Sequence, residues 1–320
     1  MLLSLLALVA VQAPQGFQTD TTVSVSQGTR LKVENQGGDI VVKTWDKNQV
    51  RVQASHSRRT HVSINLGGAV LSLEAEADHG PANMVDYELT VPVWMPLDLE
   101  GMYATVNIKG TRAPIAVETL DGDITVEGGA ETVKLTSIQG RITVTGARGR
   151  IELNTVSDDI EAAELQGDIV AETVSGSITV ARSDAKSVEI QTVSGELVYD
   201  GKILDGGHYS LLTHSGTIAM AMPEGANATI ATAIGSGEVR ASFPLPASER
   251  PSRRRQTFRL GTGSANVELE SFSGTISLLR PAELASRLDR ILERRAERDR
   301  RHKPRPEHDL DDDNDIHGGY

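Results

Sequence analysis

Residues 115–144 read IAVETLDGDITVEGGAETVKLTSIQGRITV, and within them a pair of apolar residues separated by one position recurs every nine residues. The same spacing extends in both directions, from Leu97 to Val180. Because side chains alternate between the two faces of a strand, both members of a pair point to the same face. Each nine-residue unit is therefore predicted to be one short strand and one corner. The ten pairs are Leu97/Leu99, Val106/Ile108, Ile115/Val117, Ile124/Val126, Val133/Leu135, Ile142/Val144, Ile151/Leu153, Ile160/Ala162, Ile169/Ala171 and Ile178/Val180.

The corners are of two alternating kinds, which indicates that two units form one coil of about 18 residues. Every second strand follows the phrase Thr-x-(Ser/Asp)-(Gly/Asp) or a close variant of it. Glycine tolerates backbone angles that other residues avoid, and Ser and Thr hydroxyls satisfy turn amides. Stacked coils of this kind form a β-solenoid, in which neighbouring repeats bury a continuous core. The phrases begin at Thr119, Thr155, Thr173, Thr192, Thr213 and Ser271.

The composition favours an all-β fold and excludes several functions. The chain of 320 residues is 38% hydrophobic but only 3% aromatic, and it contains 30 glycines. Its net charge of −12 opposes nucleic-acid binding, which needs a positive surface. Without cysteine it has no disulfide, thiolate metal site or cysteine nucleophile. We expect an aliphatic-cored β-solenoid that binds no cofactor.

The N-terminal part differs from the regular repeats. Residues 1–16 are interpreted as a short signal peptide, because an apolar run is followed by Val11-Gln12-Ala13, although the run lacks a preceding Lys or Arg. The run is too short for a transmembrane anchor, which needs about 20 residues. Residues 17–96 are predicted to be a β extension that covers the first coil. The protein is therefore expected to be exported to the periplasm, the cell surface or the medium.

Residues 97–280 are predicted to be the solenoid domain, in which the coils lengthen after Val180 and residues 243–256 form an inserted surface loop. Residues 281–302 are predicted to form an Arg-rich amphipathic helix that begins at Pro281 and caps the solenoid. The alternatives are a peripheral contact of this helix with an anionic membrane and a contact with a partner helix. Residues 303–320 form an acidic tail that is expected to be disordered.

No catalytic or metal site is predicted. Parallel β-helices also host polysaccharide-active enzymes, and the acids that could serve one are Asp121, Asp123, Asp158, Asp159 and Asp168. Acid and base catalysis needs two carboxyls at a controlled separation in a cleft. Here the acids recur at corners, which turn preference alone produces. Calcium-binding nonapeptide repeats share the period of nine, but their Gly-Gly-x-Gly-x-Asp phrase is missing from this sequence.

A cluster of arginines is the predicted contact for a partner. It lies in the loop at 243–256, where guanidinium groups suit phosphate or an acidic polysaccharide. The expected partner is a protein or polysaccharide of the cell envelope. The residues are Arg250, Arg253, Arg254 and Arg255.

Three phrases resemble those of a bacterial putative-adhesin family of unknown function. They are GDIVV at residues 38–42, DGDITV at 121–126 and TVSGSITV at 173–180, and the resemblance covers residues 20–280. It implies a β-solenoid that is envelope-associated and non-catalytic. The function indicated is therefore an exported adhesin-like or scaffold protein acting through its repetitive surface. The alternatives are a polysaccharide-active β-helix enzyme and, if residues 1–16 are not a signal peptide, an intracellular scaffold.

Overall fold

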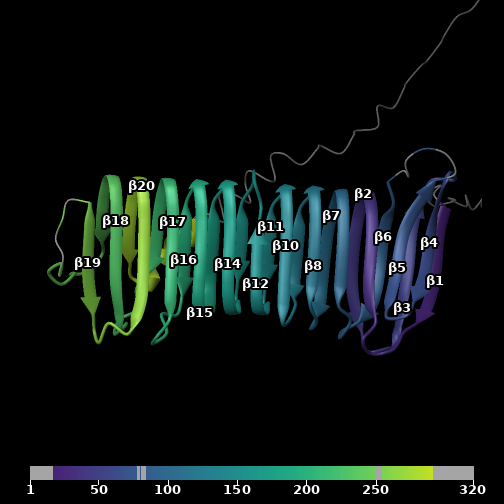
Figure 1. The fold of residues 1–320 in the computed structure, drawn as a ribbon, viewed down its shortest axis with the longest axis horizontal. Coiled ribbons are helices and arrows are strands. Elements are labelled where there is room, and N and C mark those ends of the chain that lie inside the picture. The colour runs from purple at the N-terminus through teal and green to yellow at the C-terminus, as the bar shows by residue number, and fades with distance from the viewer. Residues whose placement is uncertain (1–16, 78–79, 81–83, 250–251, 253, 291–320) are drawn as a thin grey trace, which may run out of the picture.

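The computed structural model describes residues 17–77, 80, 84–249, 252 and 254–290. Their strands form one continuous ladder that winds into an elongated solenoid (Figure 1). The fold is the all-β solenoid predicted from the nine-residue spacing. The predicted signal peptide at 1–16 and the acidic tail at 303–320 lie outside the described residues.

The regular coils are each built from two strand segments that pair in parallel with the equivalent segments of the next coil. Ile115 pairs with Val133 and Ile124 with Ile142, so the repeat is 18 residues long in both segments. This confirms the predicted coil. The strands are β8 (Ile115–Asp121), β9 (Ile124–Gly128), β10 (Thr132–Gln139), β11 (Ile142–Thr145), β12 (Arg148–Asn154), β13 (Ile160–Ala163), β14 (Gln166–Ser175), β15 (Ile178–Ser194), β16 (Leu197–Gly201) and β17 (His208–Ala221).

The core consists of columns of aliphatic side chains. Every residue of the ten predicted pairs is at most 3% exposed. Burying each Val, Leu or Ile contributes on the order of 1.5–3 kcal/mol, while ordering each residue costs about 1–2 kcal/mol. A coil has too few inward side chains to offset that cost alone, so coils are stable only when stacked.

The N-terminal end is closed by antiparallel hairpins. β2 (Arg30–Trp45) pairs in parallel with β7 (Leu97–Thr111) and is therefore a coil in its own right, whereas the sequence predicts only an extension before Leu97. Outside β2 lie β5 (Val70–Ala77) and β6 (Asp86–Pro92). Three further strands pair antiparallel with these: β4 (Thr60–Gly67) pairs with β5, β3 (Gln49–His56) pairs with β6, and β1 (Phe17–Ser24) pairs with β3.

The C-terminal coils are stacked out of sequence order. β20 (Ala265–Leu279) pairs with β17 on one side and with β18 (Ala228–Ala241) on the other. β19 (Arg255–Leu260) then lies antiparallel along the first half of β18, at the far end from β1. The predicted loop at 243–256 is thus the link from β18 into β19, and its last two residues already belong to the strand.

Residues 281–290 form a helix that packs against the side of the solenoid, not over its end as the sequence predicts. Leu284 and Leu288 are buried there, and Arg287 Nη2 lies 2.5 Å from Glu196 Oε1. The surface beneath is apolar at positions where the strands β9 and β11 carry Thr or Glu, which makes room for the helix. The contacted residues are Ala181, Val198, Ala219 and Ala221.

The rest of the predicted helix, at 291–302, lies outside the described residues. Within the part of the chain that the structure covers, no helix has the length and hydropathy needed to cross a bilayer.

The lengthened corner before β17 is held by Tyr209. Its hydroxyl donates to the Ala185 carbonyl at 2.9 Å and accepts from the Leu204 backbone N–H at 2.8 Å. Burial raises the pKa of Tyr209, which keeps the hydroxyl neutral and able to donate. One side chain therefore ties the corner to the preceding coil.

Tyr209→Phe is expected to lower the free energy of unfolding by about 1–3 kcal/mol, because the Leu204 N–H would lose its acceptor in a partly buried site. Urea unfolding followed by circular dichroism measures the change. Tyr103→Phe, at an exposed tyrosine, is the control and should stay within about 0.5 kcal/mol. Equal effects of the two changes would contradict this role of Tyr209.

Candidate interaction surface

The Thr-x-Ser-Gly corners bind one coil to the next. The threonine points inward, and at every described corner of this kind except that of Thr213, whose hydroxyl is buried without a partner, the hydroxyl donates to a backbone carbonyl of the preceding coil. Thr155 donates to Gly140 at 3.2 Å, and Thr192 donates to Gly176 at 3.1 Å. The inward turn of the threonine leaves the next residue, x, pointing into solvent.

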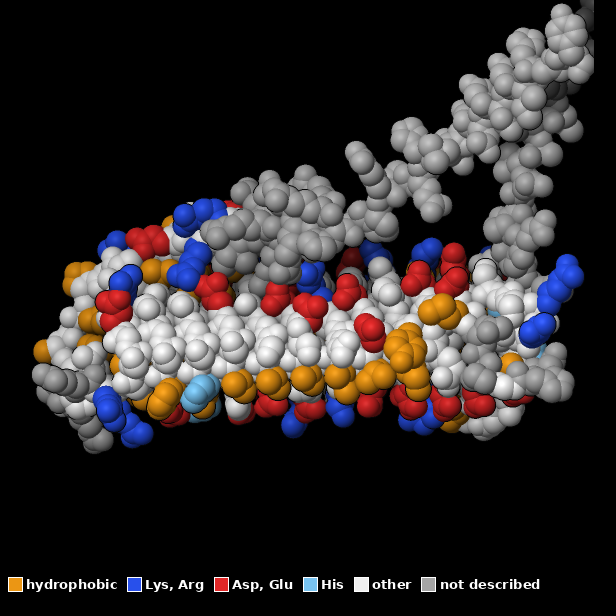
Figure 2. Space-filling model, turned by 90° about the horizontal axis from the view of Figure 1, so that it is seen from above, with side chains coloured by type: hydrophobic (Ala, Val, Ile, Leu, Met, Phe, Trp, Pro, Cys, Tyr) orange, Lys and Arg blue, Asp and Glu red, His pale blue; other side chains and the backbone are white. Residues whose placement is uncertain are grey.

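Residue x is apolar in most coils, and parallel pairing brings the x residues into one line. Figure 2 shows this line as a row of orange side chains, with one pale blue histidine, along the length of the solenoid. The apolar members are 42% to 61% exposed. His214 stacks on Phe272, with 4.8 Å between ring centroids and 4° between planes. We call this set the apolar ridge: Met102, Leu120, Ile138, Val156, Val174, Val193, His214 and Phe272.

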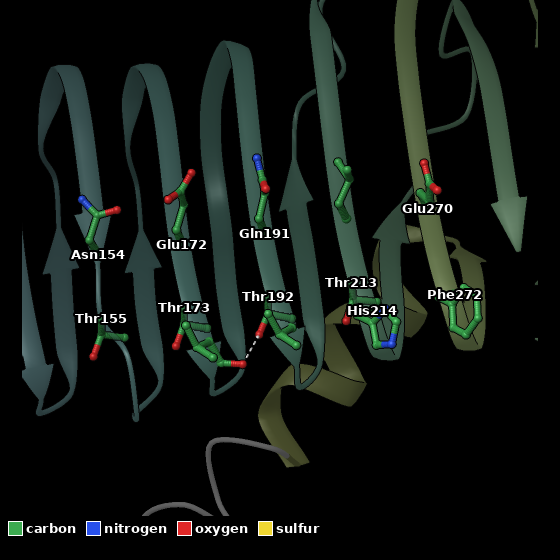
Figure 3. A pocket seen from close by; sticks show the side chains of 13 residues that line it. Asn154, Thr155, Glu172, Thr173, Gln191, Thr192, Thr213, His214, Glu270 and Phe272 are labelled. Carbon is green, nitrogen blue, oxygen red and sulfur yellow. Dashed lines mark hydrogen bonds between the residues drawn. The ribbon is translucent and has the colours of Figure 1, made fainter. Parts of the chain in front are cut away.

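A shallow groove of about 480 Å³ runs beside the ridge, from β12 to β20 (Figure 3). The inward threonines of the corners form its floor. One wall is the ridge, from Val174 to Phe272. The other wall is polar except at one position and consists of Asn154, Glu172, Gln191, Leu212 and Glu270. The groove therefore crosses five neighbouring coils and has one apolar and one mainly polar wall.

The border of the ridge is partly acidic, since four of the eight residues in the column next to it, from β7 to β20, are glutamates. Glu118, Glu172 and Glu270 are exposed in the column next to the ridge, and none of them makes a salt bridge within the described residues. Glu100 continues the column and pairs with Lys32 at 3.6 Å. The surface thus offers an apolar line beside carboxylates that are open to a cation.

The five acids considered for catalysis do not line the groove. Asp123 Oδ1 accepts from the Arg141 N–H at 2.8 Å, and Asp159 Oδ1 accepts from the Ser177 N–H at 2.7 Å, each linking two coils. Asp158 caps the next backbone N–H at its own corner. The two remaining acids, Asp121 and Asp168, stand on β8 and β14.

Nor do histidines gather into a metal site where the structure can be described. His208 Nδ1 lies 3.3 Å from the Asn266 side-chain amide, while His214 belongs to the ridge. In the described ranges no three His, Asp or Glu side chains are placed to share a metal ion.

The described part of the predicted arginine cluster lies at the C-terminal end of the ridge. Arg255 pairs with Ala233 of β18, which pairs in turn with Glu270 of β20. Arg254 and Arg255 are exposed where the chain enters β19, at the C-terminal end of the solenoid. Nearby, Arg259 pairs with Glu249 at 2.8 Å. Arg250 and Arg253 lie outside the described residues, so the cluster stays a prediction.

The sequence does contain the signal for the ridge. The x position of the repeated corner holds Leu, Val, Ile or Phe except at His214, although turn residues are usually polar. An apolar residue at the same place in successive turns predicts a line of exposed apolar side chains. The Thr, Ser and Gly of this phrase predict the corner alone, and a prediction based on them misses the ridge.

The model of the family described as Toastrack DUF4097 matches residues 14–279. The chain therefore belongs to this family, which agrees with the resemblance to putative adhesins of unknown function. No curated protein matches.

Three solved structures are similar to the chain over most of its length. A putative cell adhesion protein from Clostridium sporogenes has 9% identity and a TM-score of 0.25, with 83% of this chain and 100% of that chain covered. A putative adhesin from Parabacteroides distasonis has 10% identity and a TM-score of 0.35, with 82% and 98% covered. A putative adhesin from Bacteroides fragilis has 13% identity and a TM-score of 0.32, with 83% and 98% covered.

Proposed function

We propose that this protein is an exported, non-catalytic, adhesin-like or scaffold protein of the cell envelope that acts through the repetitive surface of its solenoid. The apolar ridge is the observation that carries the proposal. Solvent-exposed apolar side chains arranged in a continuous line mark an interaction site more often than scattered ones do. A line that repeats in most coils also suits many weak contacts made together, which raises avidity without a deep pocket.

The chemistry of the corners supports a binding role over an enzymatic one. Acid and base catalysis needs carboxyls held in a cleft with different environments. Asp123, Asp158 and Asp159 instead accept backbone N–H groups at the corners. We expect no release of reducing ends when the purified chain is incubated with acidic polysaccharides, and such release would contradict the proposal.

Compartment assignment tests the exported role. The protein is isolated from its host, its N-terminus is sequenced, and the envelope is washed with high salt. A mature start near Pro14 together with release from the envelope by salt is the expected result. An intact Met1 on a cytosolic protein would overturn export and favour an intracellular scaffold.

A further inference from the structure

We propose that the apolar ridge and its groove bind a basic amphipathic helix of a partner protein, which lies along the solenoid axis. This deepens the proposed function, on which it rests, by naming the chemistry of the partner. The contact would pair the apolar stripe of that helix with the ridge and its Lys or Arg side chains with the glutamates beside the ridge. Spacing, charge and a contact within this chain each support it.

The spacing of the ridge fits a helix better than an extended segment. Neighbouring coils lie about 4.8 Å apart, a helical turn rises 5.4 Å, and same-face side chains of a strand repeat at about 6.7 Å. Across the five coils of the groove, a helix would drift from the ridge by about 2.4 Å and a strand by about 8 Å. A helix of about 13 residues therefore keeps its stripe on the ridge along the whole groove.

The charge beside the ridge selects a basic partner. Glu172 and Glu270 form part of the groove wall, and they are exposed without a salt bridge in the described part of the chain. Glu118 extends the same column beyond the groove. Basic residues flanking an apolar stripe would reach these carboxylates, whereas an anionic lipid surface would be repelled by them.

The chain already shows this type of contact on another face. In the helix at 281–290, Leu284 and Leu288 are buried against outward-facing Val and Ala side chains of the solenoid. Arg287 of the same helix pairs with Glu196, which lies at the end of the corner that carries Val193. The outer surface of this solenoid therefore accepts a helix through an apolar stripe and an Arg-to-carboxylate pair.

The direct test measures binding of a synthetic helical peptide to the purified full chain by fluorescence anisotropy. The probe has about 14 residues, with Leu on one stripe and Lys or Arg on both flanks, and its counterpart carries Glu in place of the basic residues. We expect the basic peptide to bind at least tenfold more tightly than the acidic one, with affinity falling as salt rises. Equal affinity of the two peptides would overturn the proposal.

Surface substitutions then locate the site. Glu172→Gln with Glu270→Gln should weaken binding roughly threefold to tenfold, and Val174→Ser with Val193→Ser about tenfold. The matched control, Glu88→Gln with Glu224→Gln, makes the same charge change outside this column, on β6 and in the turn after β17, and should bind like the unaltered chain. If the control weakens binding as much as the groove variants, the contact is only nonspecific attraction and the proposal fails.

Because the chain has no cysteine, a single introduced cysteine can carry an environment-sensitive dye. The basic peptide should shift the emission of labelled Val193→Cys and leave labelled Thr132→Cys, at the start of β10, unchanged. A dimer of the chain that is lost in the Val174→Ser, Val193→Ser variant would assign the ridge to a second copy and overturn the proposal. Ridge-dependent binding to anionic phospholipid vesicles would also overturn it.

These measurements use purified protein, so their outcome is separable from the compartment assay. If the chain is cytosolic but binds the basic peptide through the ridge, the exported role is wrong and the helix-binding proposal stands. If the chain is exported but does not bind the peptide, the helix-binding proposal is wrong and the exported role stands.

Discussion

Gly195→Ala is expected to lower the free energy of unfolding by about 3 kcal/mol or more, because no side chain fits between the coils at this corner. A Cβ atom on Gly195 would lie 2.0 Å from the Gly176 carbonyl oxygen and 2.6 Å from its carbon. The φ angle of Gly195, +153°, is also in the range that favours glycine. The Gly176 carbonyl cannot retreat cheaply, since it accepts the Thr192 hydroxyl at 3.1 Å.

Equilibrium unfolding in urea, followed by circular dichroism, gives the measurement. Gly67→Ala is the matched control, because nothing lies within 4 Å of a Cβ atom at Gly67 and its φ is not in the range that favours glycine. The control should change stability by less than about 1 kcal/mol. Similar losses of stability in both variants would show that the close approach of the coils is not the reason why position 195 requires glycine.

The coil and its core could be predicted because both depend on local pattern. Parallel in-register pairing places each apolar pair over the pair 18 residues further on, as with Val133 and Ile151. A regular spacing of aliphatics is enough to require that register, since a slip by one residue would turn the pairs outward. The corner phrase was predictable for the same reason, because its glycine allows the backbone angles of the turn and its hydroxyl groups bond to nearby backbone groups.

The order of the coils could not be predicted in this way. β2 and β20 carry the same apolar alternation as their neighbours, so their sequences do not distinguish one place in the stack from another. The observed order places β20 between β17 and β18 and leaves β18 to be covered by the antiparallel strand β19. Such placement covers the edges of the stack, which is a property of the whole chain and not of one repeat.

The candidate site was only partly predictable. The sequence directs attention to charge clusters such as Arg254 and Arg255, whereas the ridge is recognised only when the x residues of successive corner phrases are compared with one another. The position of the C-terminal helix on the side of the solenoid was also not predicted, because it depends on residues that are far apart in the sequence. In the sequence, Ala219 and Ala221 do not differ from other small strand residues, although in the structure they contact the helix.

Leu135→Ala is expected to lower the free energy of unfolding by about 2–5 kcal/mol, the range for removing a buried leucine. Leu135 is fully buried, and it lies between Val117 and Leu153 of the adjacent coils. Parallel ladders hold both neighbouring strands in place, so the cavity cannot close by a small backbone shift and the loss should fall in the upper half of that range.

The same substitution on the ridge separates a structural role from a binding role. Leu120 is 42% exposed, one coil away from Leu135, and Leu120→Ala should stay within about 0.5 kcal/mol of the unaltered chain in the same urea unfolding experiment. A loss as large as that of Leu135→Ala would mean that the ridge is held against another part of the folded chain and is not free to bind. A small loss, combined with weaker binding of the basic peptide, would place the ridge among the residues that serve a partner at little cost to the fold.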